Sequence, residues 1–312
     1  MKESLAKLLQ ILSIFILILS TVLLWKGIEP FKTHYFLFAW WSYIALLDSW
    51  LYLHGGESLM IANFSNFFLF LLPFSTFFWF IFEAFNLRIQ NWSYLNMPKE
   101  IWIRWPSTFL AYASVVPGIF LTANSLDHLN IFKKNEFSQF FNLEISKFLL
   151  IFLMLTGGFM LILPLIFPAY FFPLIWGGFI LLLDPLLIHW QKKSLIREWV
   201  QRNWNRTFQL LLAGAVCGFL WELWNFWAGA KWIYTIPLPD FLASQNKIFE
   251  MPLIGFLGFP PFALECFVMT EFAQALKELL SKKIWRVLVV LGFLFSLTTC
   301  YFMDLYTILS FR

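Results

Sequence analysis

Charged residues are scarce in this chain, and their scarcity decides its class. Only 13% of the 312 residues are Asp, Glu, Lys or Arg, whereas 60% are hydrophobic and the mean hydropathy is +0.72. Soluble globular domains normally contain about 25% charged residues. The shortage of charge therefore excludes an ordinary soluble domain and predicts an all-α polytopic membrane protein.

Cysteines are few, and the signature motifs of several enzyme classes are missing. Cys217, Cys266 and Cys300 all lie in apolar runs without C-x-x-C spacing, which argues against a disulfide framework and against a zinc site. D-x-x-x-D, H-x-x-x-H, H-E-x-x-H and G-x-S-x-G motifs are absent, as are glycine-rich phosphate loops. We expect no metal and no cofactor. The pI near 8.9 follows from charge in the loops and does not indicate a nucleic-acid partner.

Long apolar runs, by contrast, fill most of the chain. Nine of them approach the length of about 20 residues that a membrane-spanning helix needs. They occupy roughly residues 4–25, 35–53, 64–86, 106–126, 147–168, 170–190, 207–228, 252–274 and 285–305. The hairpin around residues 167–170 is the boundary that the pattern defines least well.

Lysine and arginine indicate the orientation of these spans. With a cytoplasmic N-terminus, the inner segments hold 14 of the 22 Lys and Arg residues, and the loop at residues 190–206 contributes most to this excess. Positive residues concentrate in cytoplasmic loops of membrane proteins. We therefore expect an inner-membrane protein whose N-terminus is cytoplasmic.

An internal repeat supplies the conspicuous polar residues inside the apolar runs. The two copies read FEAFN and NWSY within residues 82–94, and WELWN and KWIY within residues 221–234. Glu83 therefore matches Glu222, and Asn86 matches Asn225. A glutamate and an asparagine three residues apart share one face of a helix. Because ionisable groups inside the membrane are costly, such a pair is a functional hypothesis by default.

The repeat extends along most of the chain. The offset between matched residues grows from 136 at Asp48 and Asp184 to 139 at the glutamates and 140 at Tyr94 and Tyr234. Four helices in each unit would give both units the same orientation about a pseudo-twofold axis along the membrane normal. The predicted parts are a first unit at residues 1–126, an inner loop at 127–146, a second unit at 147–275 and a C-terminal span within 276–312.

Estimated depths place the intramembrane carboxylates in two tiers, at a rise of about 1.5 Å per residue. The upper tier contains Glu83 and Glu222 with Asn86, Asn225, Tyr94 and Tyr234; the lower tier contains Asp48, Asp184 and Glu265. Glu265 has no acidic counterpart in the first unit. Its helix begins with two glycines and Pro260-Pro261, which break a helix. We expect this broken segment to border a cavity or to pack closely on a neighbour.

The polar side chains suit acid–base chemistry on a lipid. A buried carboxylic acid can protonate an alkene, aromatic faces can stabilise the carbocation, and a second carboxylate can remove the final proton. The reaction would be a cyclisation, hydration or isomerisation of a polyene lipid. The predicted catalytic residues are Glu265 as proton donor, Glu222 as cation stabiliser or base, and Asp184. The predicted substrate-binding or orienting residues are Asn225, Lys231, Trp232, Tyr234, Glu83, Asn86, Trp221 and Trp224.

One segment also carries a family resemblance. Its features are Trp221-Glu222 with Asn225, the W-x-Y step from Trp232 to Tyr234, and Pro252 followed by the intramembrane Glu265. Residues 207–270 thereby resemble integral-membrane lycopene cyclases of the carotenoid pathway, although in those cyclases paired acids follow the proline almost directly. Fungal membrane-bound meroterpenoid cyclases share the Trp-Glu step, and an uncharacterised family of bacterial membrane proteins looks similar as well. The resemblance implies a cofactor-independent enzyme with a hydrophobic isoprenoid substrate.

Two other functions fit the same residues. In a transporter or lipid-translocating protein, the carboxylates would carry protons or coordinate a substrate at the repeat axis. In a scaffold, Glu83 and Glu222 would only tie helices together, and Asp48 and Asp184 would cap the segments that follow them. A dry, lipid-accessible pocket favours the enzyme, a water-filled path open alternately to each side favours transport, and a solidly packed axis favours the scaffold.

Overall fold

The computed structural model describes residues 2–132, 145–236 and 247–311. Within these ranges the chain is almost entirely helical, which confirms the predicted class of all-α polytopic membrane protein. Nine described segments are long and apolar enough to cross a membrane: Lys2–Trp25, Tyr35–Leu53, Phe64–Ile89, Ile101–His128, Lys147–Ile166, Pro168–His189, Asn205–Trp227, Leu253–Leu279 and Lys282–Tyr306. Most of the predicted inner loop at 127–146, namely residues 133–144 with Lys133 and Lys134 of the inner positive charges, lies outside the described residues.

Several spans contain more than one helical element. The first unit has α1 (Lys2–Trp25), α2 (Tyr35–Leu53), α3 (Phe64–Asn66), a π-helical turn (Phe67–Leu71), α4 (Leu72–Ile89), α5 (Ile101–Ala113) and α6 (Val115–His128). The second unit has α7 (Lys147–Ile166), α8 (Pro168–Phe171), a 3-10 turn (Phe172–Leu174), α9 (Ile175–His189), α10 (Leu195–Val200), α11 (Asn205–Trp227), a 3-10 segment (Leu253–Gly258) and α13 (Phe259–Leu279). The last span is α14 (Lys282–Tyr306), and a 3-10 turn (Leu309–Phe311) follows it.

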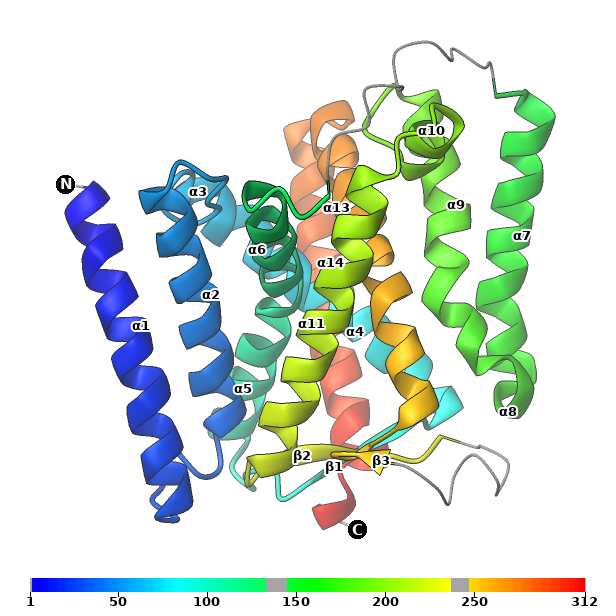
Figure 1. The fold of residues 1–312 in the computed structure, drawn as a ribbon. Helices are drawn as coiled ribbons and strands as arrows, with labels where there is room; N and C mark the ends of the chain where they lie inside the picture. Colours follow the sequence, from blue (N-terminus) through cyan, green and yellow to red (C-terminus); the bar gives the residue numbers. More distant parts are fainter. Residues whose placement is uncertain (1, 133–144, 237–246, 312) are drawn as a thin grey trace.

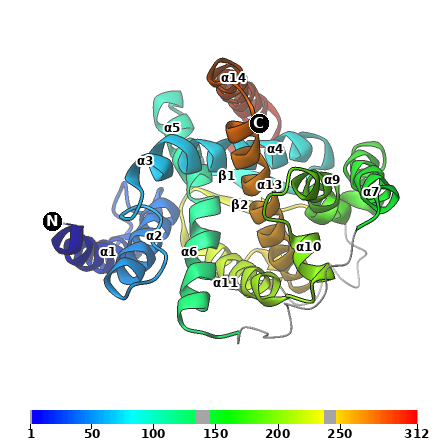
Figure 2. The same ribbon diagram turned by 90° about the horizontal axis from the view of Figure 1, so that it is seen from above.

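The two units run in the same direction through the bundle. In Figure 1, α1 and α7 both start at the face where the chain begins, and α4 and α11 both end at the opposite face, near the C-terminus. We call these the N-terminal face and the C-terminal face. Viewed along the bundle, α13 lies near the centre, while α1, α7 and α14 lie at the periphery (Figure 2). The common direction agrees with the predicted parallel repeat.

Two short strands join the units at the C-terminal face. β1 (Trp92–Leu95) follows α4, β2 (Lys231–Tyr234) follows α11, and the two pair antiparallel. Trp92 pairs with Tyr234 and Tyr94 with Trp232, so exchanging the two repeats converts one pair into the other. The register is therefore twofold-symmetric. A second pair, β3 (Lys247–Ile248) with β4 (Met251–Pro252), precedes the last span of the second unit.

The eighth span is broken at its start, as the glycines and prolines predict. Residues Leu253–Gly258 form a 3-10 segment, and the α-helix begins only at Phe259. Two glycines of α11 allow this helix start to approach closely. A Cβ added at Gly214 would lie 2.4 Å from the carbonyl oxygen of Phe259, and one at Gly218 would lie 2.2 Å from the ring of the same residue.

The last span packs on the first unit through a buried ion pair. The Arg104 guanidinium donates to both carboxylate oxygens of Asp304, at 2.8 and 2.6 Å, and Trp105 Nε1 donates to one of them at 2.9 Å. Beyond α14, the Thr307 carbonyl accepts a hydrogen bond from the backbone N–H of Tyr94 at 2.8 Å. The C-terminal span is thus fastened to both α5 and β1.

Candidate functional site

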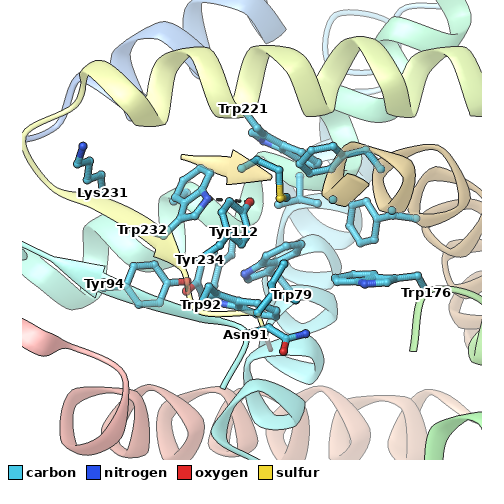
Figure 3. A pocket seen from close by; sticks show the side chains of 18 of the residues that line it. Trp79, Asn91, Trp92, Tyr94, Tyr112, Trp176, Trp221, Lys231, Trp232 and Tyr234 are labelled. Atoms are coloured by element: carbon cyan, nitrogen blue, oxygen red, sulfur yellow. Dashed lines mark hydrogen bonds between the residues drawn. The ribbon is translucent and has the colours of Figure 1, made fainter. Parts of the chain in front are cut away.

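A cavity of about 580 Å³ lies between the two units, next to the paired strands. We call it the central cavity. Its wall is mainly apolar and drawn from both units, and Phe262 belongs to it. Five tryptophans contribute to the wall: Trp79, Trp92, Trp176, Trp221 and Trp232 (Figure 3). The 3-10 segment Leu253–Gly258 contributes to the wall, which confirms that the broken helix borders a cavity. The axis between the units is therefore open, not solidly packed.

Glu83 is completely buried beside this cavity and collects hydrogen bonds on one oxygen. Its Oε1 accepts from the Tyr94 hydroxyl at 2.5 Å, Trp79 Nε1 at 2.9 Å, Trp92 Nε1 at 3.0 Å and the Tyr112 hydroxyl at 3.0 Å. Oε2 is buried and has no hydrogen-bond partner. Four donors stabilise negative charge on this carboxyl group, because hydrogen bonds to the ionised form favour it.

Glu222 occupies the matching place on α11 with far fewer donors. Its Oε1 accepts from the Tyr234 hydroxyl at 2.6 Å, and this hydroxyl in turn accepts from Trp232 Nε1 at 2.9 Å. Its Oε2, like that of Glu83, is buried and unpartnered. Glu222 is completely buried, and the tyrosine that contacts it, Tyr234, belongs to the same predicted upper tier.

The two repeat asparagines hold the strands in place. Asn86 accepts from the backbone N–H of Trp92 at 3.2 Å and donates to the Trp92 carbonyl at 2.9 Å. Asn225 makes the equivalent pair of hydrogen bonds to Trp232, at 2.9 and 2.8 Å. These asparagines therefore position the Trp and Tyr of each W-x-Y step against the glutamate of the same unit.

Tyrosines connect the buried carboxyl groups to the cavity. Tyr94, Tyr112 and Tyr234 all line the cavity, and each hydrogen-bonds a glutamate that is not itself part of the wall. Burial, and next the neighbouring carboxyl group, raise the pKa of Tyr94 and of Tyr234 well above the ordinary value of tyrosine. Both phenols therefore keep their protons at neutral pH and can donate hydrogen bonds.

Glu265 lies away from the cavity wall. Its Oε1 accepts from the backbone N–H of Phe179 at 3.2 Å, and its Oε2 is buried without a partner. Phe179 lies near the start of α9, three residues after Trp176, where the backbone is non-helical and the helix is kinked. Phe179 lies five residues before Asp184, so Glu265 sits about 7 Å along α9 from the depth predicted for it. The predicted cavity exists, but Phe262 borders it and Glu265, one turn later, does not.

Asp48 and Asp184 cap the segments that follow their helices. Asp48 accepts three backbone N–H hydrogen bonds, from residues 59, 60 and 61, at 2.6 to 3.0 Å. Asp184 accepts from the Ser194 hydroxyl at 2.6 Å and from two N–H groups, those of Leu195 at 3.0 Å and Ile196 at 2.9 Å. The capping contacts predicted for this pair are confirmed. Both oxygens of Asp184 are occupied, and it is not on the cavity wall.

The other predicted residues divide between the cavity and its surroundings. Trp221, Trp232 and Lys231 line the cavity. Trp224 packs against Trp40 instead, with ring centroids 5.2 Å apart. Lys231 was predicted to bind or orient the substrate, and its ammonium group forms an ion pair with Glu250, 2.5 Å away.

Sequence reasoning missed several residues of the site. Trp79 lies one helical turn before Glu83, so helix spacing could have identified it. Tyr112 comes from α5 and Trp176 from the kink of α9, and no local pattern links either residue to a glutamate. In the described part of the chain, no group of three or more His, Cys, Asp or Glu side chains could hold a metal ion. Comparison with protein-family models, with curated proteins and with solved structures gives no match for this chain.

Proposed function

We propose that this protein is an intramembrane acid–base enzyme that rearranges an isoprenoid lipid without a cofactor. One observation carries the proposal: an apolar aromatic cavity between the units has three phenols on its wall, each hydrogen-bonded to a buried glutamate. A volume of about 580 Å³ is typical of sites that enclose a small molecule or one end of a longer lipid.

The chemistry starts with proton transfer to an alkene. The O–H bond of the acid breaks, a C–H bond forms at one alkene carbon, and the other carbon becomes a cation. In a cyclisation, a second alkene of the same chain attacks the cation. A carboxylate then removes a proton, which takes away the positive charge and leaves a new alkene. The product is then an isomer of the substrate. The tryptophan faces stabilise the cation, and the apolar wall excludes the water that would quench it.

The different hydrogen bonding of the two glutamates suggests their roles. Glu83, with four donors, is the group that stabilises negative charge and accepts the final proton. Glu222 has one donor and supplies the first proton. When Oε1 of Glu222 carries this proton, it can donate to Tyr234, whose own hydroxyl proton then turns to the cavity. These roles differ from those predicted from the sequence, because Glu265 does not reach the wall.

The resemblance to lycopene cyclases stays a proposal, and the carotenoid precursors that it implies are candidate substrates. We also propose that the N-terminal face is cytoplasmic and that the membrane is the inner membrane, which would place the central cavity toward the outer side. The positive loop Trp190 to Arg206, on the N-terminal face, supports this orientation. A proton-coupled lipid transporter would use the same carboxyl groups and is the alternative that the experiment must separate.

The test is lipid analysis of cells that carry a carotenoid pathway and express the full-length protein. Glu222→Gln preserves the shape of the side chain and its hydrogen bond to Tyr234, but the amide cannot protonate an alkene. We expect the wild type to produce a new lipid of unchanged mass or, in a hydration, of mass increased by one water. Glu222→Gln should reduce this product at least about a hundredfold, the lower range for loss of general acid catalysis.

Two further variants complete the design. Glu57→Gln changes an exposed glutamate outside the cavity and should leave the product unchanged. Glu265→Gln should reduce the product by much less than Glu222→Gln, and the opposite order would restore Glu265 as the donor. Identical lipids in cells with and without the wild type would refute the enzyme and leave lipid transport, measured in vesicles, as the better hypothesis.

A further inference from the structure

The central cavity reaches the outside of the bundle at one edge of the second unit. Ile254 and Leu257 line the cavity, yet these residues are 42% and 72% exposed. Both belong to the 3-10 segment Leu253–Gly258, which lies inside the eighth membrane span. Exposed apolar side chains within a span face the hydrocarbon of the bilayer. A wall residue that also faces lipid marks the place where the cavity meets the membrane.

The opposite edge of this opening comes from the sixth span and from α7. A Cβ added at Gly258 would lie 3.8 Å from the indole of Trp176, so the 3-10 segment and the kink of α9 approach each other here. In Figure 1, α8 and β3, which precede the two edges, lie near the C-terminal face. We call this opening the lateral mouth and define it by six residues that line the cavity: Met160, Phe172, Leu174, Gly177, Ile254 and Leu257.

The equivalent place in the first unit is closed by a tryptophan. Trp41 Nε1 of α2 donates to the Leu110 carbonyl of α5 at 3.3 Å, which joins the two helices. The offset of 136 residues that relates Asp48 to Asp184 relates Trp41 to Gly177. The first unit therefore has an indole where the second unit has no side chain. This difference accounts for an opening on one side of the pseudo-symmetric bundle.

Gly177 leaves space in the mouth and is not required by a close helix contact. A Cβ added at Gly177 would meet only the terminal methyl of Met160, at 3.3 Å. At the next residue, Gly178, an added Cβ would lie 2.6 Å from the side chain of Leu161. Glycine weakens a helix relative to alanine, so a glycine without a packing role needs another explanation. An opening that must stay clear for a ligand is such an explanation.

We propose that the central cavity takes up its ligand directly from the membrane through the lateral mouth, as an apolar isoprenoid chain from the leaflet at the C-terminal face. The inference rests on the proposed function for the isoprenoid class and extends it by naming the source and the route of the substrate. None of the six mouth residues carries a charge, a hydroxyl or an amide side chain. An apolar chain can pass them without losing contact with hydrocarbon, whereas a water-filled transport path would be lined with polar groups.

The mouth also suits a ligand longer than the cavity. One end of a long chain would lie among the tryptophans and phenols of the wall, and the rest would extend past Gly177 into the bilayer. Gly177 then determines access to the site without touching the reacting atoms.

The test measures exchange of a lipid, so that it does not depend on turnover. Purified full-length protein in dodecyl maltoside is mixed with micelles that contain lycopene, and the loaded protein is then diluted into empty micelles. Circular dichroism in the visible band of lycopene reports binding, because an achiral polyene acquires this signal only in a chiral cavity. We expect Gly177→Trp to slow loading and release by about tenfold or more each, with much less change in final occupancy. Gly177→Ala should slow them little.

The control is Gly158→Trp, the same substitution on α7 at a point where an added Cβ meets nothing within 4 Å and which is not on the cavity wall. It should leave both rates unchanged. If Gly177→Trp does not fold, Gly177→Leu is measured and should slow both rates in the same direction.

Three outcomes separate this inference from the proposed function. Unchanged rates in Gly177→Trp would overturn the lateral mouth. Faster release with lower occupancy would mean that the indole displaces the ligand from the cavity, which would also overturn it. Exchange that depends on residue 177 without formation of any product would refute the enzyme but support this route of entry.

Discussion

At the scale of single residues, the site divides into side chains that are saturated with hydrogen bonds and side chains that are not. The repeat asparagines use both ends of their amides, whereas Glu83, Glu222 and Glu265 each keep one buried oxygen unpartnered. Unpartnered buried oxygens weaken a fold, because each one loses its hydrogen bonds to water. A side chain that serves only to tie helices together would be expected to have all its polar atoms hydrogen-bonded. The scaffold explanation therefore accounts for the asparagines better than for the glutamates.

The repeat asparagines give a prediction about stability. Asn225→Leu removes two hydrogen bonds to Trp232 and leaves the part-buried N–H and C=O groups of Trp232 unpaired. The protein should therefore lose about 1–3 kcal/mol of stability. Thermal unfolding in detergent measures the change. Asn124→Leu is the matched control, because Asn124 lies within α6 and makes one exposed hydrogen bond, to the carbonyl of Glu57. If the two substitutions lowered the stability equally, the two hydrogen bonds to β2 would contribute no more than an exposed hydrogen bond does.

Some residues of the site could be found in the sequence and others could not. Glu83 and Glu222 stand out because they recur in register inside apolar runs. Gly177 did not stand out, since glycine is common in membrane-spanning helices, and its open surroundings are visible only in the packed structure. Glu265 was recognised as unusual, but its partner is the backbone N–H of Phe179, just after the kink of α9, and the sequence pattern does not locate this kink.

At the scale of the elements, the length and position of the apolar runs were sufficient to place every span of the described chain to within five residues at each end. The predicted runs 35–53 and 207–228, for example, correspond to Tyr35–Leu53 and Asn205–Trp227. Strand pairing was beyond the same reasoning. β1 and β2 have four residues each, and such short segments carry too little periodicity to reveal that Trp92 pairs with Tyr234 and Leu95 with Lys231.

Close packing of α7 on α9 gives a prediction with an internal control. A Cβ added at Gly157 would lie 2.4 Å from the backbone nitrogen of Leu182 and 2.7 Å from the carbonyl oxygen of Gly178, whereas one added at Gly158 would meet nothing within 4 Å. Gly157→Ala should therefore push the helices apart and cost about 1–3 kcal/mol, the usual penalty of overpacking. Gly158→Ala should be neutral or slightly stabilising. Thermal unfolding of the two variants, measured side by side, would contradict this packing if they behaved alike.

At the scale of the whole molecule, the ninth span supports the elements that form the site. The sequence placed this span outside the two units. In the structure, Asp304 pairs with Arg104 of α5, and the Thr307 carbonyl accepts a hydrogen bond from β1, beside Glu83. The ion pair is largely removed from solvent, with side-chain exposures of 5% for Arg104 and 16% for Asp304. The last span therefore supports the strand that carries Trp92 and Tyr94.

Breaking this ion pair should be more harmful than replacing it. Asp304→Leu leaves the Arg104 charge buried without its partner, and we expect a loss of about 3–5 kcal/mol. The double variant Arg104→Met with Asp304→Leu should recover most of that stability. Unfolding curves of the single and double variants measure both effects. A double variant no more stable than the single one would mean that the arginine's other contacts, to the carbonyls of Pro98 and Lys99, dominate.

The symmetric register of β1 and β2 has a consequence for the history of the chain. Antiparallel pairing in which equivalent residues exchange places is the geometry of an isologous contact between two identical subunits. A homodimer of the four-helix unit would close by this same strand pair, with two copies of every wall residue around one shared cavity. In a single chain that contained both units, each unit would be free to change alone. Asn91 and Lys231, which are forced to be identical in a homodimer, are different in this chain, and the cavity thereby acquires two distinct ends.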